Sequence, residues 1–461
     1  MKPPISLRFT EGQEEQFRGH LFPGDGLETV ALALCGQFRM TGGTGYCLHE
    51  VVPVPIERCS VRRPDAVTWP VELVVPLLEK AAARGLVLLK VHSHPPSYDD
   101  FSPQDDETDR ALADSFRHLI DGETTHLSAI LPYSGELRVR AVGRDGEFRP
   151  VGRLVRVGDR IGANILTEAR APDAAQASAV QAFGEGTYQA LRSLRVGVVG
   201  CSGTGSWVAE MLGRLGVGSL VLVDPEVIER RNLNRIVNST ADDVANHRPK
   251  VELLREAVMA MDQGTKVEVF SQDLLSAEVV QTLASCDVLF GCVDSADGRD
   301  LLNRIATFYL VPLIDLGVRI DAGTGGKAEQ ICGAVHFLVP GGSSLLSRGV
   351  ITAKQVESDG MRRHHPKQHA KLLREGYVKG TAVSRPAVVS LNGFIAAHAV
   401  NELLARIHGF RRDDLAEFRY QLFDLREGSW QRIPEGPPCQ ALGRFVGRGD
   451  ARPLLNNPSL S

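Results

Sequence analysis

The sequence lacks the features of a membrane protein and of a disulfide-rich secreted protein. No apolar run among its 461 residues approaches the roughly 20 residues that span a bilayer. The N-terminal stretch MKPPISLRFTEG has no apolar core of the kind that a signal peptide needs. The eight cysteines are scattered and include no Cys-x-x-Cys pair, which predicts reduced thiols in a chain of this size. We therefore expect a cytoplasmic protein.

An excess of charge of one sign is also missing, since the formal net charge is −4. Without a basic surplus there is no reason to expect nucleic acid or an anionic membrane as a partner. Low-complexity tracts and internal repeats are absent. The composition, 43% hydrophobic and 23% charged, is that of an ordinary globular protein. The length allows two or three domains with their own cores.

Hydrophobic periodicity divides the chain near residue 160. The first half contains strand-like apolar runs at 29–34, 86–91, 126–131 and 137–142. It also contains a helix pattern at 71–83. The second half alternates strands (195–199, 219–224, 266–270, 287–291, 311–315) with helices (205–215, 250–261, 299–308), before a long helix over 387–407. This alternation predicts an α/β fold with a mostly parallel sheet covered on both faces. We expect domains at 1–157 and 178–461, joined by a linker over 158–177.

A candidate metal site lies in the segment KVHSHPPSYDDFSPQD at 90–105. His92 and His94 alternate at the end of an apolar strand, so their imidazoles leave the same face. Asp105 follows in the next segment as a third ligand. Two histidines and one carboxylate with an open fourth position form the ligand set of a catalytic zinc. The neighbouring acids are expected to be solvated loop charges (Asp99, Asp100, Asp106 and Glu107).

The spacing His-x-His, then seven residues, then Ser-x-x-Asp resembles the JAMM/MPN metallopeptidase family. Members cleave isopeptide or peptide bonds at the C-terminus of ubiquitin-like proteins. The resemblance, which covers about residues 20–145, implies that Ser102 hydrogen-bonds the developing oxyanion. It also implies an upstream glutamate as general acid and base. Glu28, at the head of an apolar strand, fits that role, with Glu14, Glu15 and Glu50 as competitors.

A second candidate site begins with Gly200, Gly203 and Gly205, between a strand and a helix. Glycines there let the backbone approach a phosphate at the helix N-terminus. Asp224, at the end of the next strand, stands where an acid would hold ribose hydroxyls. These residues alone also fit an enzyme that binds NAD.

The residues that follow separate the two interpretations. Asn232, Arg235, Lys250 and Asp294 form a series that an NAD enzyme does not need. Adenylation does need triphosphate charge neutralised and a metal held. The series resembles the MoeB/ThiF and ubiquitin-activating family, which adenylates the C-terminal glycine of a ubiquitin-like protein.

That resemblance covers about residues 183–432 and implies a role for each position. Asp224 would bind the ribose of ATP, and Asn232, Arg235 and Lys250 would contact its phosphates. Asp294 would hold magnesium. The expected partners are a ubiquitin-like protein ending in glycine, a conjugating enzyme, and a second copy of the chain, joined through the adenylation domain.

The chain departs from this family at several places. Ser202 stands where the glycine loop usually has another glycine. The family's arginine that reaches the ATP of its partner falls on Ser178, with Arg160 or Arg170 as substitutes. Two Cys-x-x-Cys pairs that bind structural zinc in many relatives fall on Ser344 and Ser347, and on Cys439 and Leu442, so we expect no zinc there. The Gly- and Arg-rich tail is expected to be mobile.

The segment 348–385, where a catalytic cysteine would lie, contains none. Its histidines, His364, His365 and His369, are expected in a mobile polar loop. The chain is interpreted as a bifunctional enzyme of a bacterial-type ubiquitin-like pathway, with a zinc isopeptidase half and an ATP-dependent activating half. The alternative is the trimming and activation of a sulfur carrier for biosynthesis. A scaffold without catalysis is disfavoured, because the residues for metal and ATP are present.

Overall fold

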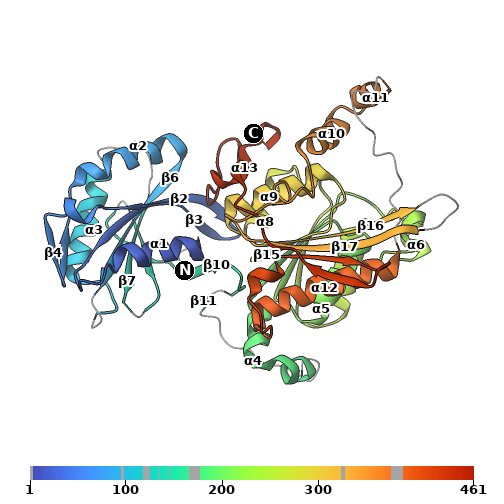
Figure 1. Ribbon diagram of the computed structural model, residues 1–461, viewed down its shortest axis with the longest axis horizontal. Helices are drawn as coiled ribbons and strands as arrows, with labels where there is room; N and C mark the ends of the chain where they lie inside the picture. Colours follow the sequence, from blue (N-terminus) through green and yellow to red (C-terminus); the bar gives the residue numbers. More distant parts are fainter. Residues whose placement is uncertain are drawn as a thin grey trace.

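The computed structural model describes residues 4–94, 98–117, 125–133, 135–143, 145–162, 164–165, 177–322, 328–374 and 388–460. Two large sheets lie side by side, each with helices on both faces (Figure 1). No helix in these ranges combines the length and the apolar character needed to cross a bilayer.

The N-terminal sheet has nine strands in the order β11-β10-β1-β3-β2-β6-β7-β8-β9. Its strands are β1 (Ile5–Thr10), β2 (Val30–Met40), β3 (Gly43–Pro53), β6 (Leu86–His94), β7 (His126–Pro132), β8 (Arg138–Val142), β9 (Phe148–Pro150), β10 (Arg153–Val157) and β11 (Asn164–Ile165). Beside it lies the hairpin of β4 (Val61–Arg63) and β5 (Ala66–Thr68). The sheet is mixed, because β6 pairs parallel to β7 and antiparallel to β2.

Side chains that alternate along β2 and β6 form two separate cores. On one face Ala31 and Leu89 pack against α1 (Glu11–Leu21). On the other face Leu32 and Leu88 pack against α2 (Val75–Arg84). The helix α3 (Pro103–Arg117) adds Leu112 to this second face. Because side chains alternate along a strand, His92 and His94 point to the same face of β6 as Leu88, the face covered by α2 and α3.

The C-terminal sheet has eight strands in the order β14-β13-β12-β15-β16-β17-β18-β19. They are β12 (Arg195–Val199), β13 (Ser219–Val223), β14 (Lys266–Phe270), β15 (Val288–Gly291), β16 (Leu313–Ala322), β17 (Ala328–Leu338), β18 (Tyr420–Asp424) and β19 (Ser429–Arg432). The strands from β14 to β16 pair in parallel, as the alternation predicts. The strands β17, β18 and β19 extend the sheet antiparallel. The sheet is therefore mixed rather than mostly parallel throughout.

Helices cover both faces of this second sheet. On one face lie α5 (Gly203–Arg214), α7 (Lys250–Ala260) and α12 (Val389–His408). On the other face lie α8 (Ala277–Ala284) and α9 (Ala296–Tyr309). The remaining helices are α4 (Ala177–Ser193), α6 (Ala241–Ala245), α10 (Ala353–His364), α11 (Pro366–Arg374) and α13 (Gln440–Gly443).

The expectation of a mobile polar loop around the three histidines is wrong for the described residues. His364 ends α10, and His369 lies in α11. The His369 side chain is buried and its Nε2 lies 3.2 Å from Ser358 Oγ. Arg363 of α10 pairs with Asp297 at the start of α9, which fixes α10 on the domain.

The segment expected as a linker is partly attached to the second half. Asp159 accepts hydrogen bonds from Arg406 and Arg419, and Ile161 belongs to the core around α12. Residues 164–165 add the short strand β11 to the first sheet. The part at 166–176 lies outside the described residues.

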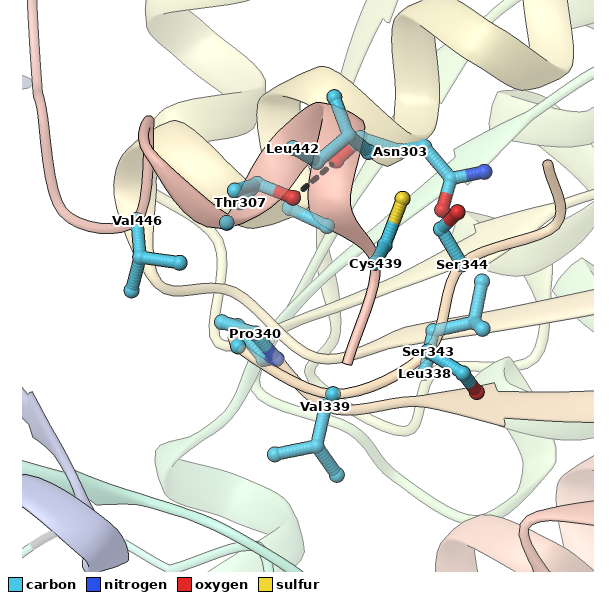
Figure 2. Close-up of a pocket in the computed structure, with 14 residues that line it drawn as sticks. Asn303, Thr307, Leu338, Val339, Pro340, Ser343, Ser344, Cys439, Leu442 and Val446 are labelled. Carbon is cyan, nitrogen blue, oxygen red and sulfur yellow. Dashed lines mark hydrogen bonds between the residues drawn. The ribbon is translucent and has the colours of Figure 1, made fainter. Parts of the chain in front are cut away.

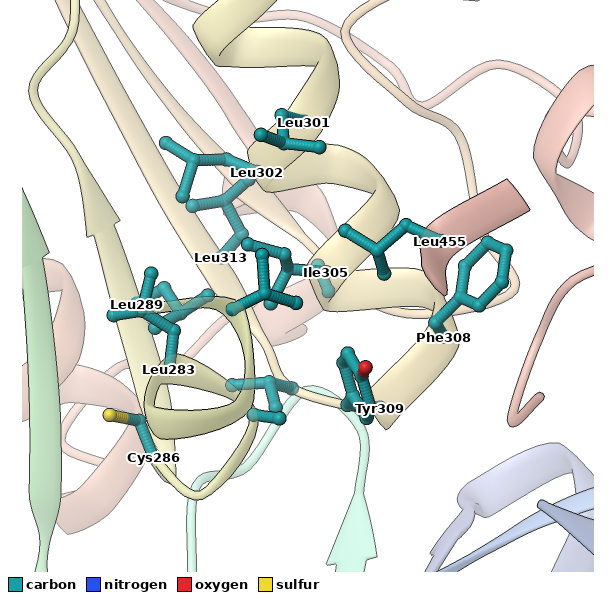
Figure 3. Packing of buried hydrophobic residues seen from close by; sticks show 14 of the residues in the cluster. Leu283, Cys286, Leu289, Leu301, Leu302, Ile305, Phe308, Tyr309, Leu313 and Leu455 are labelled. Carbon is teal, nitrogen blue, oxygen red and sulfur yellow. The ribbon is translucent and has the colours of Figure 1, made fainter. Parts of the chain in front are cut away.

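The C-terminal segment packs between the two halves, so its expected mobility is wrong for residues 440–460 (Figure 1). Gly447 N donates to Thr307 O of α9, and Gly447 O accepts from Gly36 N of β2. Phe445 stacks on Phe308 with ring centroids 5.0 Å apart. Leu455 is fully buried beside Phe308 (Figure 3). The tail thus joins β2 of the first half to α9 of the second.

Candidate metal and nucleotide sites

Three potential metal ligands converge at the end of β6. The Nε2 atoms of His92 and His94 lie 3.0 Å apart. Asp105, in the first turn of α3, places one carboxylate oxygen 2.9 Å from His92 Nε2 and the other 3.3 Å from His94 Nε2. The sequence spacing places these residues on consecutive elements, because α3 is the next helix after β6 in the chain. Among the residues that the structure describes, this is the one group of three such side chains that could hold a metal ion.

The donor set fits a catalytic zinc. The ligand atoms lie within 4.8 Å of one another, and two imidazoles with one carboxylate are the ligands that leave a fourth zinc position open. Burial lowers the pKa of His92, which favours the neutral imidazole that a metal requires. His94 Nδ1 lies 3.3 Å from Tyr98 O, and such a contact fixes the ring orientation of a ligand.

Ser102 and Asp105 hold each other at the start of α3. Ser102 N and Oγ both donate to Asp105 Oδ2 at 2.7 Å, and Asp105 N donates to Ser102 Oγ at 3.1 Å. This reciprocal pattern is that of a capping box. The Ser102 hydroxyl therefore lies beside the ligand group, and in this structure it donates to a ligand carboxylate.

Glu28 lies just before β2 and lines the same cavity as the histidines. Its backbone is held by the β4 hairpin, because Glu28 N donates to Arg63 O and Glu28 O accepts from Arg62 Nε. Burial raises the pKa of Glu28 to about 7, against the opposing charge of His94. The competing glutamates lie elsewhere: Glu50 pairs with Lys80, and Glu14 with Arg18.

The cavity has a volume of about 540 Å³ and an apolar side that the sequence did not reveal. Val67 on β5, Trp69 just after it and Tyr98 line it together with the histidines. Neither residue belongs to a periodic pattern, so nothing in the sequence marked them. An apolar wall beside a few polar groups is typical of a ligand-binding pocket.

The glycine loop of the second site joins β12 to α5. Gly200 has a φ of +89°, and a Cβ there would lie 2.6 Å from Cys292 O. A Cβ on Gly205 would lie 1.8 Å from Gly200 O. Both positions therefore require glycine for the close packing of α5 on the sheet. At Gly203 a Cβ would meet a side chain instead of the backbone, 2.2 Å from Asn392 Nδ2, so this position is less strictly limited to glycine.

Asp224 and Lys250 lie together at the carboxyl edge of the sheet. Asp224 accepts from Cys201 N at 2.7 Å, which ties it to the glycine loop. Lys250, the first residue of α7, has a side chain only 2% exposed, and its Nζ lies 3.8 Å from Asp224 Oδ1. It also pairs with Glu226. Burial raises the pKa of Asp224, and the charge of Lys250 opposes that rise.

Arg235 lies beside the start of α5, with its Cδ 3.2 Å from a Cβ placed on Gly203. Its guanidinium donates to Arg231 O at 2.7 Å. Asn232 is buried, and its Oδ1 accepts from Glu229 N, so part of its amide caps a turn. Asp294 is exposed three residues after β15. Because parallel strands end at one edge, Gly200, Asp224 and Asp294 meet there.

The departures from the family can be placed in part. Arg160 lies against the backbone of Gly409 at the end of α12. Ser178 lies in α4, whereas Arg170 lies outside the described residues. Ser344 and Cys439 line one small pocket with Asn303 (Figure 2), so the positions aligned with zinc ligands do come together. Ser344 N donates to Ser347 Oγ there. The absence of zinc at this place stays a prediction.

Comparison with known proteins then decides the family. The ThiF family matches residues 174–441. The chain belongs to the ThiF family. This agrees with the parallel strands, the glycine loop and the order of Asp224, Arg235 and Lys250 in the second half. The match begins after the first sheet, so it does not test the metal site.

Several curated proteins are similar to parts of the chain. The SAMP-activating enzyme E1 of Haloferax volcanii is 36% identical over 124 residues, which are 27% of this chain and 45% of that enzyme. Ubiquitin-like modifier-activating enzyme 5 of Caenorhabditis elegans is 24% identical over 228 residues, 47% of this chain and 49% of the relative. Adenylyltransferase and sulfurtransferase MOCS3 of Caenorhabditis briggsae is 30% identical over 135 residues, 29% of this chain and 33% of the relative.

The chain spans about half the length, or less, of these curated relatives. Among solved structures, E. coli MccB is similar to 58% of this chain, with 72% of its own length covered, 15% identity and a TM-score of 0.45.

Proposed function

We propose that this ThiF-family chain is a bifunctional enzyme that acts on the C-terminus of a ubiquitin-like protein. Its second half would adenylate a terminal glycine, and its first half would be a zinc isopeptidase that exposes or releases that terminus. The observation that supports two activities best is the convergence of His92, His94 and Asp105 in a cavity distinct from the glycine loop of the second sheet.

In the first half, His92, His94 and Asp105 would hold the zinc ion. When bound there, zinc would supply a water of pKa about 7 and Lewis-acid polarisation of the scissile carbonyl. Glu28, with a pKa of about 7, can take up a proton from the attacking water and deliver it to the leaving amine. The Ser102 hydroxyl can turn from Asp105 to donate to the developing oxyanion. Val67 and Trp69 would hold the peptide beside these groups.

In the second half, the glycine loop and the N-terminus of α5 would receive the phosphates of ATP. Asp224 would accept hydrogen bonds from the ribose hydroxyls. Lys250, Arg235 and Asn232 would offset the charge of the phosphates. Asp294 would help to hold magnesium, which is usually bound by one or two carboxylates together with phosphate oxygens. The glycine carboxylate then attacks the α-phosphate, and pyrophosphate leaves.

The step after adenylation distinguishes two pathways. No cysteine lies between residues 348 and 385, so we propose that the adenylate passes directly to a nucleophile on a partner, such as a conjugating enzyme, rather than to a loop thiol. The alternative within this chain is an ester on a hydroxyl such as that of Ser384, which lies outside the described residues; direct transfer is preferred because serine is a poor nucleophile without an activating base. The similarity to MOCS3, an adenylyltransferase and sulfurtransferase, favours a second candidate function, in which sulfur is the acceptor. The mass of the product separates an amide or ester from a thiocarboxylate.

The isopeptidase proposal is tested with a ubiquitin-like protein that carries a short peptide beyond its terminal glycine. The full-length chain should release this peptide, and Asp105→Ala should not, because a lost ligand abolishes metal-dependent hydrolysis. Glu107→Gln is the matched control, since Glu107 is exposed on the same helix. Equal cleavage by the parent and by Asp105→Ala would contradict the proposal.

A second copy of the chain, joined through the adenylation half, is proposed as the working assembly.

A further inference from the structure

Behind the metal ligands lies a cluster of four charged side chains from three elements. Lys90 comes from β6, Asp106 and Asp109 come from α3, and Arg140 comes from β8. The side chains of Lys90, Asp109 and Arg140 are 6%, 1% and 8% exposed. Asp106, expected as a solvated charge, instead pairs with Arg140. Two cations and two carboxylates make the cluster neutral, as buried charges require.

Arg140 contacts α3 at more than one place. Its Nη1 donates to Asp106, and its Nε and Nη2 donate to Asp109 Oδ2 at 3.1 and 2.6 Å. Its guanidinium lies 3.8 Å from the ring centroids of both Phe101 and Phe148. A planar guanidinium can make paired hydrogen bonds and stack on rings at once, which a lysine cannot.

These contacts lie on both sides of the turn from Ser102 to Asp105, which carries the proposed ligand. Phe101 directly precedes Ser102, Asp106 directly follows Asp105, and Asp109 lies one helical turn further along the same face as Asp105. Lys90, which pairs with Asp109, lies two residues before His92 on the same face of β6. The cluster therefore connects the strand that carries the histidines to the helix that carries the carboxylate ligand.

We propose that Arg140, on a strand that carries no metal ligand, is a positioning residue that sets Asp105 and Ser102 against His92 and His94. This inference rests on the proposed zinc site. Arg140 fixes the first turn of α3 from both sides, through Phe101 and through Asp106. Without it, Asp109 keeps Lys90 as its partner, so α3 stays attached but its first turn is free to shift. Loss of Arg140 should therefore displace the metal ligands more than it destabilises the fold.

The test uses full-length variants and two readouts other than activity. Zinc affinity is measured by competition with a chelator, and the geometry of the site is followed by the absorption spectrum of the Co²⁺-loaded chain. Arg140→Met should weaken zinc binding by about 10-fold and should alter the Co²⁺ spectrum. This is the lower end of the effect of losing a direct partner of a ligand, because Arg140 acts on Asp105 through Phe101 and Asp106. Arg140→Lys, which keeps the charge, should recover part of the affinity. The control Glu107→Gln should match the parent in both.

Thermal unfolding establishes that each variant is folded. Should Arg140→Met fail to fold, Phe101→Leu decides, because it removes the stacking contact without leaving a buried charge unpaired. Weaker zinc binding and a changed spectrum in the folded variant support the inference. Zinc affinity within twofold of the parent, with an unchanged spectrum, overturns it while leaving the isopeptidase proposal intact. A parent chain that binds no zinc overturns both.

Discussion

Arg8, on the first strand of the N-terminal sheet, donates a hydrogen bond of 2.9 Å to the backbone oxygen of Tyr309, the last residue of α9. The same guanidinium donates to Ala284 O at 2.7 Å and to Cys286 O at 2.9 Å, at the end of α8. Arg8 is 2% exposed. A cation at two helix C-termini meets the negative ends of both helix dipoles. The two halves are therefore joined through a buried polar contact and not only by a linker.

This contact predicts that Arg8→Met destabilises the whole chain. Three helix-end carbonyls would lose their donor inside the interface, at a cost of about 1–3 kcal/mol for each group left unsatisfied. We expect the urea midpoint to fall clearly, with both halves affected. Arg18→Met is the control: Arg18 is 36% exposed in its pair with Glu14, and such pairs contribute about 0–1 kcal/mol. Equal midpoints for Arg8→Met and Arg18→Met would show that the contact contributes nothing.

The C-terminal tail is predicted to form a second contact that holds the two halves together. Gly447 has a φ of +70°, and a Cβ there would lie 2.1 Å from Leu48 O. Gly447→Val should therefore displace the tail from β3 and expose the bonds after Arg444 and Arg448 to trypsin. Gly443→Ala, where a Cβ meets nothing within 4 Å, is the control. Unchanged trypsin resistance in Gly447→Val would mean that the tail does not depend on this approach.

The metal content follows from the positions of the ligands. We predict one zinc per chain, lost in His92→Ala and in His94→Ala but retained in Cys439→Ala, as measured by elemental analysis of the full-length proteins. Thiolates supply most of the affinity of a structural zinc site, and of the four positions aligned with zinc ligands in the second half only Cys439 is a cysteine. Zinc that persists in His94→Ala would place the metal elsewhere.

The adenylation half is tested by ATP–pyrophosphate exchange in the presence of a ubiquitin-like protein ending in glycine. Asp294→Ala and Lys250→Met should each lower the exchange rate by about 100-fold or more. Lys250 is proposed to offset the charge of the phosphates, and Asp294 to help hold the magnesium ion that does the same. Arg230→Ala, close in the chain to Arg235 but not assigned to the nucleotide, should exchange like the parent. Full exchange by Asp294→Ala would mean that the magnesium ligand is another residue.

Local patterns predicted the parts of this molecule that depend on neighbours in the sequence. The strands β12 and β14 begin and end where their apolar runs do, and His92, His94 and Asp105 come together because a strand leads into the next helix through one loop. Parallel strands explain why Gly200 and Asp224 meet. These relationships need only strand alternation and strand order.

Contacts between distant segments could not be predicted in this way. Arg8 is a lone cation in an apolar strand, and Gly447 lies in a tail that looks mobile in sequence. Each nevertheless donates a hydrogen bond to a backbone oxygen of α9, a helix far away in the sequence from Arg8 and Gly447. Asp106 looks solvated among neighbouring acids until Arg140, 34 residues away, is placed beside it. The strands β17 to β19 were missed because antiparallel additions lack the alternation with helices that marks β12 to β16.

We propose that one chain both exposes and activates the same C-terminus. The most direct test is ATP–pyrophosphate exchange with two substrates: a ubiquitin-like protein ending in glycine, and the same protein with a peptide beyond that glycine. The parent chain should exchange with both. His94→Ala should exchange with the trimmed substrate alone, since it cannot expose the carboxylate of the extended one. Equal exchange by His94→Ala with both substrates, or none by the parent with the trimmed one, would contradict the claim.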